Sequence, residues 1–356
     1  MIDSDGKLAE FLPVLRAADW VALDTEADSL HAYPEKLCLL QISTSIGDEL
    51  IDPLSRVDLH PLWTELQMHQ LILHGADYDL RLLRKNHSFV PNCIFDTMLA
   101  SRLLGEREFG LGSLLKRHLG VTLEKGSQKA DWSRRPLTPR MEVYARNDTH
   151  YLKPLSNILS EQLRQKERLA WLEQSCARLV AECAVPPKPD SDLVWRIRGS
   201  NKLTPPSLAI LREIWHWREQ EALAANRPPF FVLSHETLIE IAEVTTSHGR
   251  IDGLLPRHFS SRRKDGLQEA IQKGLQVRPE EHPHPLRSQS RRQSEAERRR
   301  FLELETRRNQ KAAELALDPT LIASRAMLLA LAGDWDRHKN EIMDWQREIL
   351  TSALIA

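Results

Sequence analysis

The sequence predicts a mixed α/β domain followed by all-helical domains, on three observations. Between residue 18 and about residue 105, short β-rich runs alternate with runs of helical periodicity. From Leu111 onward the apolar spacing is helical almost throughout. The stretch AVPPKPDSD, residues 184–192, places three prolines among polar residues and is typical of a linker. A chain of 356 residues is too long for one typical core, so two or three domains are expected.

The elements of the α/β domain follow from local patterns. Apolar, β-rich runs bounded by turn residues predict strands in WVALDTEA, KLCLLQIST, DELIDPL and LILHGA. Amphipathic runs predict helices in HPLWTELQM and YDLRLLRKNH. Thr138 is an N-cap residue followed by Pro139 at the first helical position, so a helix is expected to begin there and to run past Tyr151. Pro154 predicts a kink or a break in that helix.

Composition shifts divide the chain into domains and linkers. The stretch VRPEEHPHPLRSQS predicts a second linker between two helical regions. A basic tract from Arg287 to Arg308 is interleaved with glutamates, which favours a solvated, salt-bridged helix over direct contact with RNA. The expected segments are an α/β domain at 1–183, a linker at 184–199, a helical domain at 200–280, a linker at 281–290 and a last helical domain at 291–356.

Bulk properties exclude several classes of protein. The formal net charge is −1, so basicity of the whole chain does not indicate a nucleic-acid partner, and any such partner must be argued from local groups. The four cysteines have no zinc-site spacing and are expected as free thiols in a reducing compartment. The N-terminus does not resemble a secretory signal, and no run of about 18 apolar residues predicts a membrane span. We therefore expect a cytoplasmic protein without a membrane partner.

Two acidic residues stand at the end of the first expected strand. Because alternate side chains of a strand share a face, Asp24 and Glu26 lie side by side. In the interior of a sheet both carboxylates would lose hydration without a built-in partner, which costs several kcal/mol unless a cation balances them. A bound metal ion is one such cation, and an exposed strand end is the simpler alternative for an isolated Asp-x-Glu pair.

Two further positions carry candidate ligands. Asp77 and Asp79 follow the expected strand LILHGA near a helix start, where capping alone favours acids. Tyr144 and Asp148 are spaced i, i+4 on a helix and project from one face, which is also the pattern of an ordinary surface pair. The order of all three groups along the chain, however, is the layout of a two-metal carboxylate site.

This combination resembles the three exonuclease motifs of the ribonuclease D family, the DEDD branch whose third motif carries tyrosine. Asp24 and Glu26 match the first motif, Asp79 the second, and Tyr144 with Asp148 the third. Asp79 is preferred to Asp77 because HGA precedes it at the family's spacing. The loop SQKADWSRRPL, residues 127–137, resembles another family stretch, with alanine where the family commonly has serine. The resemblance covers residues 1 to about 175 and implies a ribonuclease H-like fold.

The helical regions add to the resemblance. Residues 200–280 resemble an HRDC domain, a small helical module that binds nucleic acid. Residues 291–356 resemble a degenerate second copy, mainly through LDPTLIASRAMLLALA. A helicase, which can also carry HRDC domains, is excluded because the sequence contains no G-x-x-x-x-G-K-[ST] phosphate loop.

The resemblance implies a 3′-to-5′ exoribonuclease that hydrolyses RNA from an unpaired 3′ end, in tRNA maturation or related trimming. Oxygen ligands suit two Mg²⁺ or Mn²⁺ ions better than zinc. We expect Asp24 to bridge the two ions, with Glu26 and Asp148 on the ion beside the nucleophile and Asp79 on the other, largely through water. Tyr144 is expected to orient the attacking water, since a phenol is a poor full base. The partner is RNA, and a monomer is expected.

Five residues are candidates for substrate contact: His74, Gln128, Trp132, Arg134 and Arg135. Arginine can bind phosphate and tryptophan can stack on a base of a single strand. The alternative is that Trp132 packs in the core and the arginines are solvated. Two other functions stay open, a DNA exonuclease of the same superfamily and a catalytically silent RNA-binding scaffold.

Overall fold

The computed structural model describes the chain except for residues 125, 187–189, 248, 258, 287–292 and 352–356. The excepted residues include part of the proline-rich linker, the end of the second expected linker and the start of the basic tract, so these predictions lie outside the described residues. Internal contacts divide the chain into two compact units. The first comprises Met1–Ala27, Leu37–Pro186 and Ser290–Ala356, and the second comprises Asp28–Lys36 and Pro187–Gln289.

The first unit contains a sheet in the order β3-β2-β1-β4-β5. The strands are β1 (Val21–Ala27), β2 (Leu37–Ser43), β3 (Asp48–Ile51), β4 (Gln70–Leu73) and β5 (Cys93–Asp96). The pairs β1–β2 and β2–β3 are antiparallel, whereas β1–β4 and β4–β5 are parallel. The four predicted strands are present. The sequence prediction missed β5, a strand of only four residues that leads directly into a helix.

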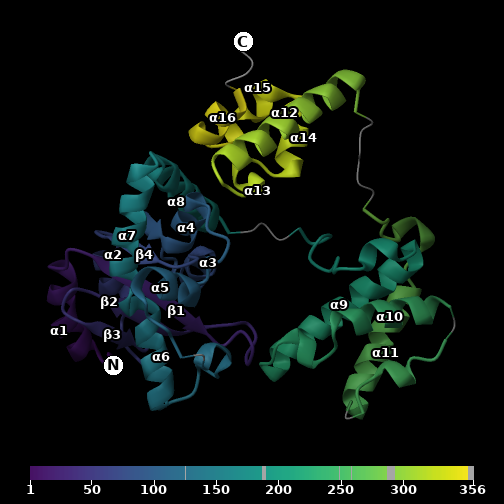
Figure 1. The fold of residues 1–356 in the computed structure, drawn as a ribbon. Coiled ribbons are helices and arrows are strands. Elements are labelled where there is room, and N and C mark those ends of the chain that lie inside the picture. Colours follow the sequence, from purple (N-terminus) through teal and green to yellow (C-terminus); the bar gives the residue numbers. More distant parts are fainter. Residues whose placement is uncertain (125, 187–189, 248, 258, 287–292, 352–356) are drawn as a thin grey trace. The chain divides into compact units, whose positions relative to one another are not determined.

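Helices surround this sheet (Figure 1). They are α1 (Asp5–Arg16), α2 (His60–Leu66), α3 (Asp77–His87), α4 (Thr97–Leu104), α5 (Leu111–Leu119), α6 (Pro139–His150), α7 (Leu152–Gln165) and α8 (Leu169–Ala184). As predicted, α6 begins after Thr138, whose side chain accepts a hydrogen bond from the backbone N–H of Met141. The expectation that this helix runs past Tyr151 is wrong, because α6 ends at His150 and α7 begins at Leu152, so the break lies at Tyr151, before Pro154. Proline is tolerated there because it lies in the first turn of α7, where an N–H has no partner within the helix.

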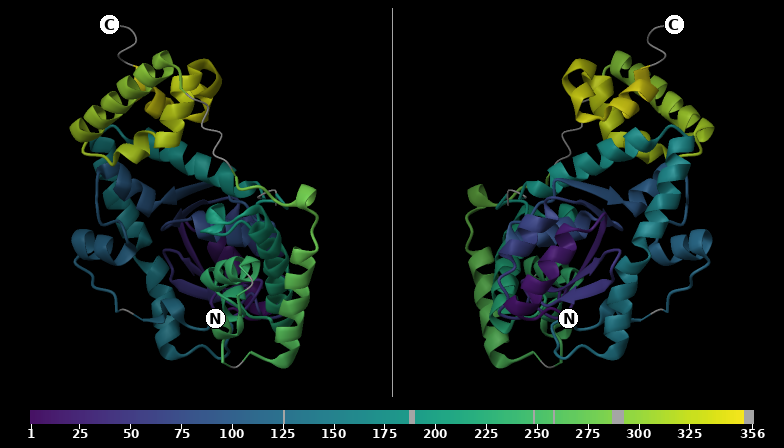
Figure 2. Two further views of the ribbon diagram at one scale, coloured as in Figure 1. Left: turned by 90° about the vertical axis from the view of Figure 1, so that its right-hand side faces the viewer. Right: turned by 90° about the vertical axis from the view of Figure 1, so that its left-hand side faces the viewer.

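The last helices belong to the same unit. They are α12 (Glu295–Glu314), α13 (Pro319–Ile322), α14 (Arg325–Gly333), α15 (Trp335–His338) and α16 (Asp344–Thr351). Their buried residues, Phe301 and Leu328 among them, are part of one hydrophobic cluster with the sheet. Trp345 stacks on Trp171 of α8 at 4.7 Å between ring centroids, and both views in Figure 2 show these helices beside α8. The sequence did not predict this shared core.

The second unit is helical and has its own core. Its helices are α9 (Pro205–Ala225), α10 (His235–Thr246) and α11 (Ser261–Leu275). The side chains of Thr204, Ser234 and Ser260 cap their N-termini. Trp195, which is fully buried, packs in this core with residues of all three helices. Short 3-10 turns complete the two units at η1 (Ser127–Lys129), η2 (Ser200–Lys202), η3 (Pro229–Phe231), η4 (Asp252–Leu254), η5 (Pro279–Glu281) and η6 (Lys339–Glu341).

The helix pairs α9–α10 and α12–α14 contain the same buried arginine contact. In α9, Arg218 donates through Nη1 to the carbonyl of Leu233, fifteen residues ahead. In α12, Arg308 donates through Nη1 to the carbonyl of Ala323, also fifteen residues ahead. Both arginines are buried, and each carbonyl precedes a serine that caps the next helix. Corresponding residues of the two segments are therefore 90 positions apart in the sequence (308 − 218).

Within the described ranges, no helix combines the length and the hydropathy that crossing a membrane requires.

Candidate active site

Strand β1 presents the first two acids on one face of the sheet. Asp24 is paired with Gln41 of β2, and Glu26 with Leu39, so these four side chains share that face. Thr25 points to the opposite face. Both carboxylates are partly buried rather than solvated at a strand end.

Helix α6 brings a third acid to the same face. Ser43 of β2 donates through its hydroxyl to Thr149 of α6, with 2.7 Å between the oxygens. Nδ1 of His150 in α6 lies 2.7 Å from Oδ2 of Asp48 at the start of β3. The side chain of Arg146 donates to the backbone carbonyl of Asp48. These contacts dock the C-terminal half of α6 on the β2–β3 hairpin, and Asp148 lies within that half.

Three carboxylates converge as a result. Asp24, Glu26 and Asp148 each offer one oxygen, and these oxygens lie within 4.8 Å of one another. Carboxylate oxygens are hard ligands of the kind that Mg²⁺ and Mn²⁺ prefer. The residues therefore fit a divalent cation.

The cluster is electrostatically unfavourable by itself. Burial raises the pKa of Asp24 well above its usual range, and the charge of Asp148 adds to this effect. Burial, together with the charges of Asp24 and Asp148, raises the pKa of Glu26 to about 10. Burial raises the pKa of Asp148 to about 7, against the opposing effect of a hydrogen bond from Tyr144. A cation among these groups would remove the repulsion that raises their pKa values.

Asp79 of α3 contacts β1 through Thr25. It is 5% exposed, and Thr25 donates to its carboxylate through Oγ1. Burial raises the pKa of Asp79, and the charge of Asp24 raises it further, so the two carboxylates interact. Asp77, the alternative from sequence, is exposed and forms an ion pair with Arg81 at 2.8 Å. The structure thus places Asp79, and not Asp77, beside the strand that carries the acids.

Comparison with known proteins shows the family of the chain. Residues 1–164 match the sequence model of a 3′-5′ exonuclease family, and residues 207–247 match that of the HRDC domain. A ribonuclease D of Zymomonas mobilis is 33% identical over 292 residues, which are 80% of this chain and 74% of that protein. The chain belongs to the ribonuclease D family. A ribonuclease D of Pseudomonas paraeruginosa is 30% identical over 99% of this chain and 96% of its own length.

Solved structures show the same relationship. The ribonuclease D of Escherichia coli, described as an exoribonuclease involved in structured RNA processing, is 25% identical and superposes with a TM-score of 0.77 over 100% of this chain and 97% of that one. A protein from Bifidobacterium adolescentis, 23% identical with a TM-score of 0.83 over 99% and 95% of the two chains, shares the fold. The predicted family and fold class are confirmed, and the chain is a 3′-to-5′ exoribonuclease of the ribonuclease D family.

Tyr144, which the sequence resemblance assigned to the third motif, lies on α6 one turn before Asp148. Its hydroxyl interacts with Asp148, and burial together with the nearby carboxylates raises the pKa of Tyr144 above its usual value. The phenol therefore keeps its proton at neutral pH. The ring of Trp132 lies 6.0 Å from that of Tyr144. Trp132 is 1% exposed and packs with Leu39 of β2. Of the two alternatives that the sequence left open for Trp132, the structure therefore shows packing in the core rather than exposure for base stacking.

The remaining substrate candidates of the family loop separate into two groups. Arg135 donates to both oxygens of Asp52, at 2.7 and 2.6 Å, and to the carbonyl of Cys38, so it anchors the loop to the sheet. Arg134 has 80% of its side chain exposed and contacts Asp131 at 3.0 Å. Gln128 is also exposed. Of the four loop candidates, Arg134 and Gln128 thus lie on the surface, while Trp132 and Arg135 lie in the body of the domain.

Asp96, which sequence reasoning missed, builds the turn that leads to Asp79. Its carboxylate accepts from the backbone N–H groups of Gly75 and Ala76, at 3.0 and 2.9 Å, and also caps α4. The signal for it was an N-cap aspartate after an apolar run in IFDT. His74, a predicted substrate residue, has its Nδ1 at 2.9 Å from Oγ1 of Thr97, and burial lowers its pKa.

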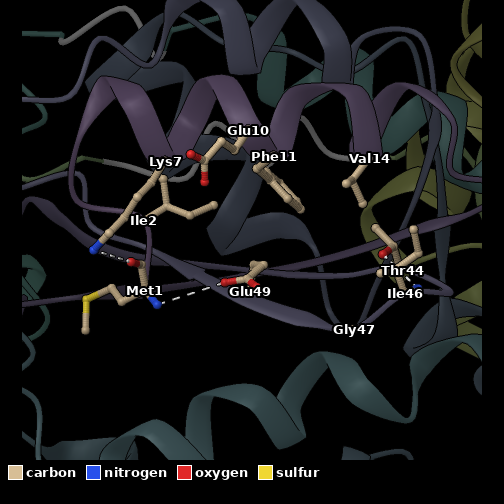
Figure 3. A pocket seen from close by; sticks show the side chains of 10 residues that line it. All are labelled: Met1, Ile2, Lys7, Glu10, Phe11, Val14, Thr44, Ile46, Gly47 and Glu49. Carbon is tan, nitrogen blue, oxygen red and sulfur yellow. Dashed lines mark hydrogen bonds and ion pairs between the residues drawn. The ribbon is translucent and has the colours of Figure 1, made fainter.

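A cavity of about 360 Å³ lies elsewhere in the domain (Figure 3). Lys7, Glu10 and Phe11 of α1 face the turn between β2 and β3, where Thr44 and Glu49 line the opposite side. None of the predicted site residues lines this cavity.

Proposed function

We propose that this enzyme removes nucleotides from the unpaired 3′ end of RNA, such as tRNA precursors, with two Mg²⁺ or Mn²⁺ ions bound by the acids at β1. The observation that carries the proposal is the convergence of Asp24, Glu26 and Asp148 within 4.8 Å, in the region of residues 1–164 that matches the 3′-5′ exonuclease family. It would act as a cytoplasmic monomer.

The acids divide between the two ions in this proposal. Asp24 would be shared by both, because its carboxylate interacts electrostatically with those of Asp148 and Asp79. Glu26 and Asp148 would hold the ion beside the nucleophile, and Asp79 would hold the other, largely through water. Two such ions, when bound, lower the pKa of water and stabilise the charge that develops on the leaving oxygen.

Tyr144 would orient the attacking water. Its raised pKa keeps the phenol protonated, so it serves as a hydrogen-bonding group rather than as the base. Replacing Tyr144 with Phe should reduce turnover and leave RNA binding nearly unchanged. An equal loss of RNA affinity in this variant would contradict the orienting role.

Contact with RNA would come from the surface of the loop and from the helical domains. Arg134 and Gln128 are exposed near the Tyr144 helix and suit phosphate and base contacts, and His74 is a third candidate. Trp132 and Arg135 would act indirectly, by holding this loop and the Tyr144 ring in place. We also propose the division into an exonuclease domain at 1–183, an HRDC domain at 200–280 and a second HRDC-like segment at 291–356, with linkers at 184–199 and 281–290. Trp195 of the first linker adds to the core of the HRDC domain, and the last segment shares the core of the exonuclease domain. The repeated buried arginine contact supports the second copy.

A labelled substrate tests the proposal. A 5′-labelled RNA with an unpaired 3′ tail should shorten from its 3′ end in Mg²⁺ or Mn²⁺, and should stay intact with chelator or with Asp24→Ala. A matched DNA strand distinguishes the DNA exonuclease, which would shorten it faster than the RNA. Binding of RNA without shortening, with either ion, would leave only the silent scaffold.

A further inference from the structure

Gln41 is a buried polar residue that neither the motifs nor the proposed mechanism uses. It lies in the middle of β2, within the otherwise apolar run LCLLQIS, and is 0% exposed. Neither its side-chain nitrogen nor its side-chain oxygen has a hydrogen-bond partner among the residues that the structure describes. An amide without a hydrogen-bond partner in the core destabilises a fold. Its presence therefore indicates that the amide gains a partner in the functional state.

The register of the sheet places this amide at the carboxylate cluster. Gln41 is directly opposite Asp24 on the neighbouring strand, and side chains of directly paired residues are in contact range. Its neighbours on the same face of β2 are Leu39 and Ser43. Leu39 packs in one cluster with Ala145 of α6, and Ser43 bonds to Thr149 of α6. Gln41 therefore lies beside Asp24, on the face of β2 against which α6, the helix of Asp148, packs.

We infer that Gln41 is a positioning residue for the metal-binding carboxylates. Its amide N–H donates to Asp24 in the cation-loaded site and holds that carboxylate in the orientation that the ion requires. A neutral donor suits this role because it pairs with a carboxylate oxygen without competing with the ion for charge. The carbonyl oxygen of the same amide can accept a hydrogen bond from a water molecule. This inference rests on the proposed metal-dependent function.

Binding of Mn²⁺ alone to the full chain tests the inference without any RNA. Gln41→Met keeps the length of the side chain and removes the amide. We expect the dissociation constant for Mn²⁺, measured by electron paramagnetic resonance, to rise about tenfold, which is typical for loss of an outer hydrogen bond to a ligand. The melting temperature without metal should stay equal or rise, because an unpaired polar group has been removed from the core.

Two comparison variants separate the outcomes. Ser43→Ala removes the neighbouring bond to α6 and should lower the melting temperature, which shows what a structural defect in this region looks like. Asp24→Asn should abolish tight Mn²⁺ binding. If it binds like the wild type, the metal site itself is wrong; if it does not, but Gln41→Met binds Mn²⁺ like the wild type, only the role of Gln41 is wrong.

A parallel loss of metal affinity and of metal-free stability in Gln41→Met would make Gln41 a packing residue and would overturn the inference.

Discussion

The helix pairs α9–α10 and α12–α14 share the same caps and buried arginine contact but pack in different hydrophobic cores. The first pair builds a core of its own around Trp195, whereas the second adds its apolar residues to the core of the α/β domain. Local devices such as caps and buried arginines therefore determine how the helices fold, and the outward face determines what they pack against. The corresponding positions are Thr204 and Ser294, Arg218 and Arg308, Asn226 and Ala316, and Ser234 and Ser324.

The largest expected effect concerns the two buried tryptophans. Trp345→Ala should lower the free energy of unfolding of the α/β unit by about 3–5 kcal/mol, since Trp345 is 2% exposed in the shared core. Hydrogen exchange at the β1 amides measures this loss. Trp195→Ala should produce a similar loss that is confined to α9–α11. Unchanged protection of β1 in Trp345→Ala would show that the shared core adds little to the exonuclease domain.

Replacing the two buried arginines should lower the free energy of unfolding by different amounts. Arg218 donates at 2.8 Å to the carboxylate of Glu219, whereas Arg308 donates at 2.8 Å to the neutral amide of Asn309 and has the carboxylate of Glu305 only at 3.9 Å. Bonds to charged groups are the stronger ones, so Arg218→Met should cost about 2–3 kcal/mol and Arg308→Met about 1–2 kcal/mol. Urea denaturation followed separately in the two units measures both values. A larger cost for Arg308→Met would contradict this ranking.

The N-cap serines should be equivalent. Ser234 accepts from the backbone N–H of Thr237, and Ser324 from that of Met327, each at 3.1 Å. Replacing either serine with alanine should cost about 1 kcal/mol, because each change leaves one helix N–H without its cap. Thermal denaturation of the two single variants tests the equivalence, and a difference well above this value would show that the two segments are less alike than their bonds suggest.

The smallest expected effect on stability concerns the two residues with a left-handed backbone conformation, and it has opposite signs at the two positions. Ala316 is exposed and adopts a left-handed conformation with φ 53°, so Ala316→Gly should stabilise by about 0.5–1 kcal/mol. Asn226, at φ 46°, is better suited to this conformation, and its side chain accepts from the N–H of Tyr33. Asn226→Gly should therefore destabilise slightly. Melting temperatures that move in the same direction for both variants would refute this contrast.

Much of the fold and site followed from local patterns. The acids of β1 and the Tyr144 helix were predictable because strand alternation and helix capping act over a few residues. The shared core was not, because the apolar face of α16 does not specify which surface will cover it. The position of Trp132 stayed undecided for the same reason. Gln41 carried a signal, a single polar residue within an apolar strand, whose meaning depends on the register with β1.

The shared core also has a consequence for the order of synthesis. The sheet and the acids of β1 leave the ribosome well before Trp345 and Leu350 of α16, which help to close the core. Until then the partner surface around Trp171 stays open to water and to other chains. A chain that lacks α16 therefore exposes apolar surface around Trp171 that chaperones and proteases recognise, so the α/β domain is stable only after α16 has packed on it.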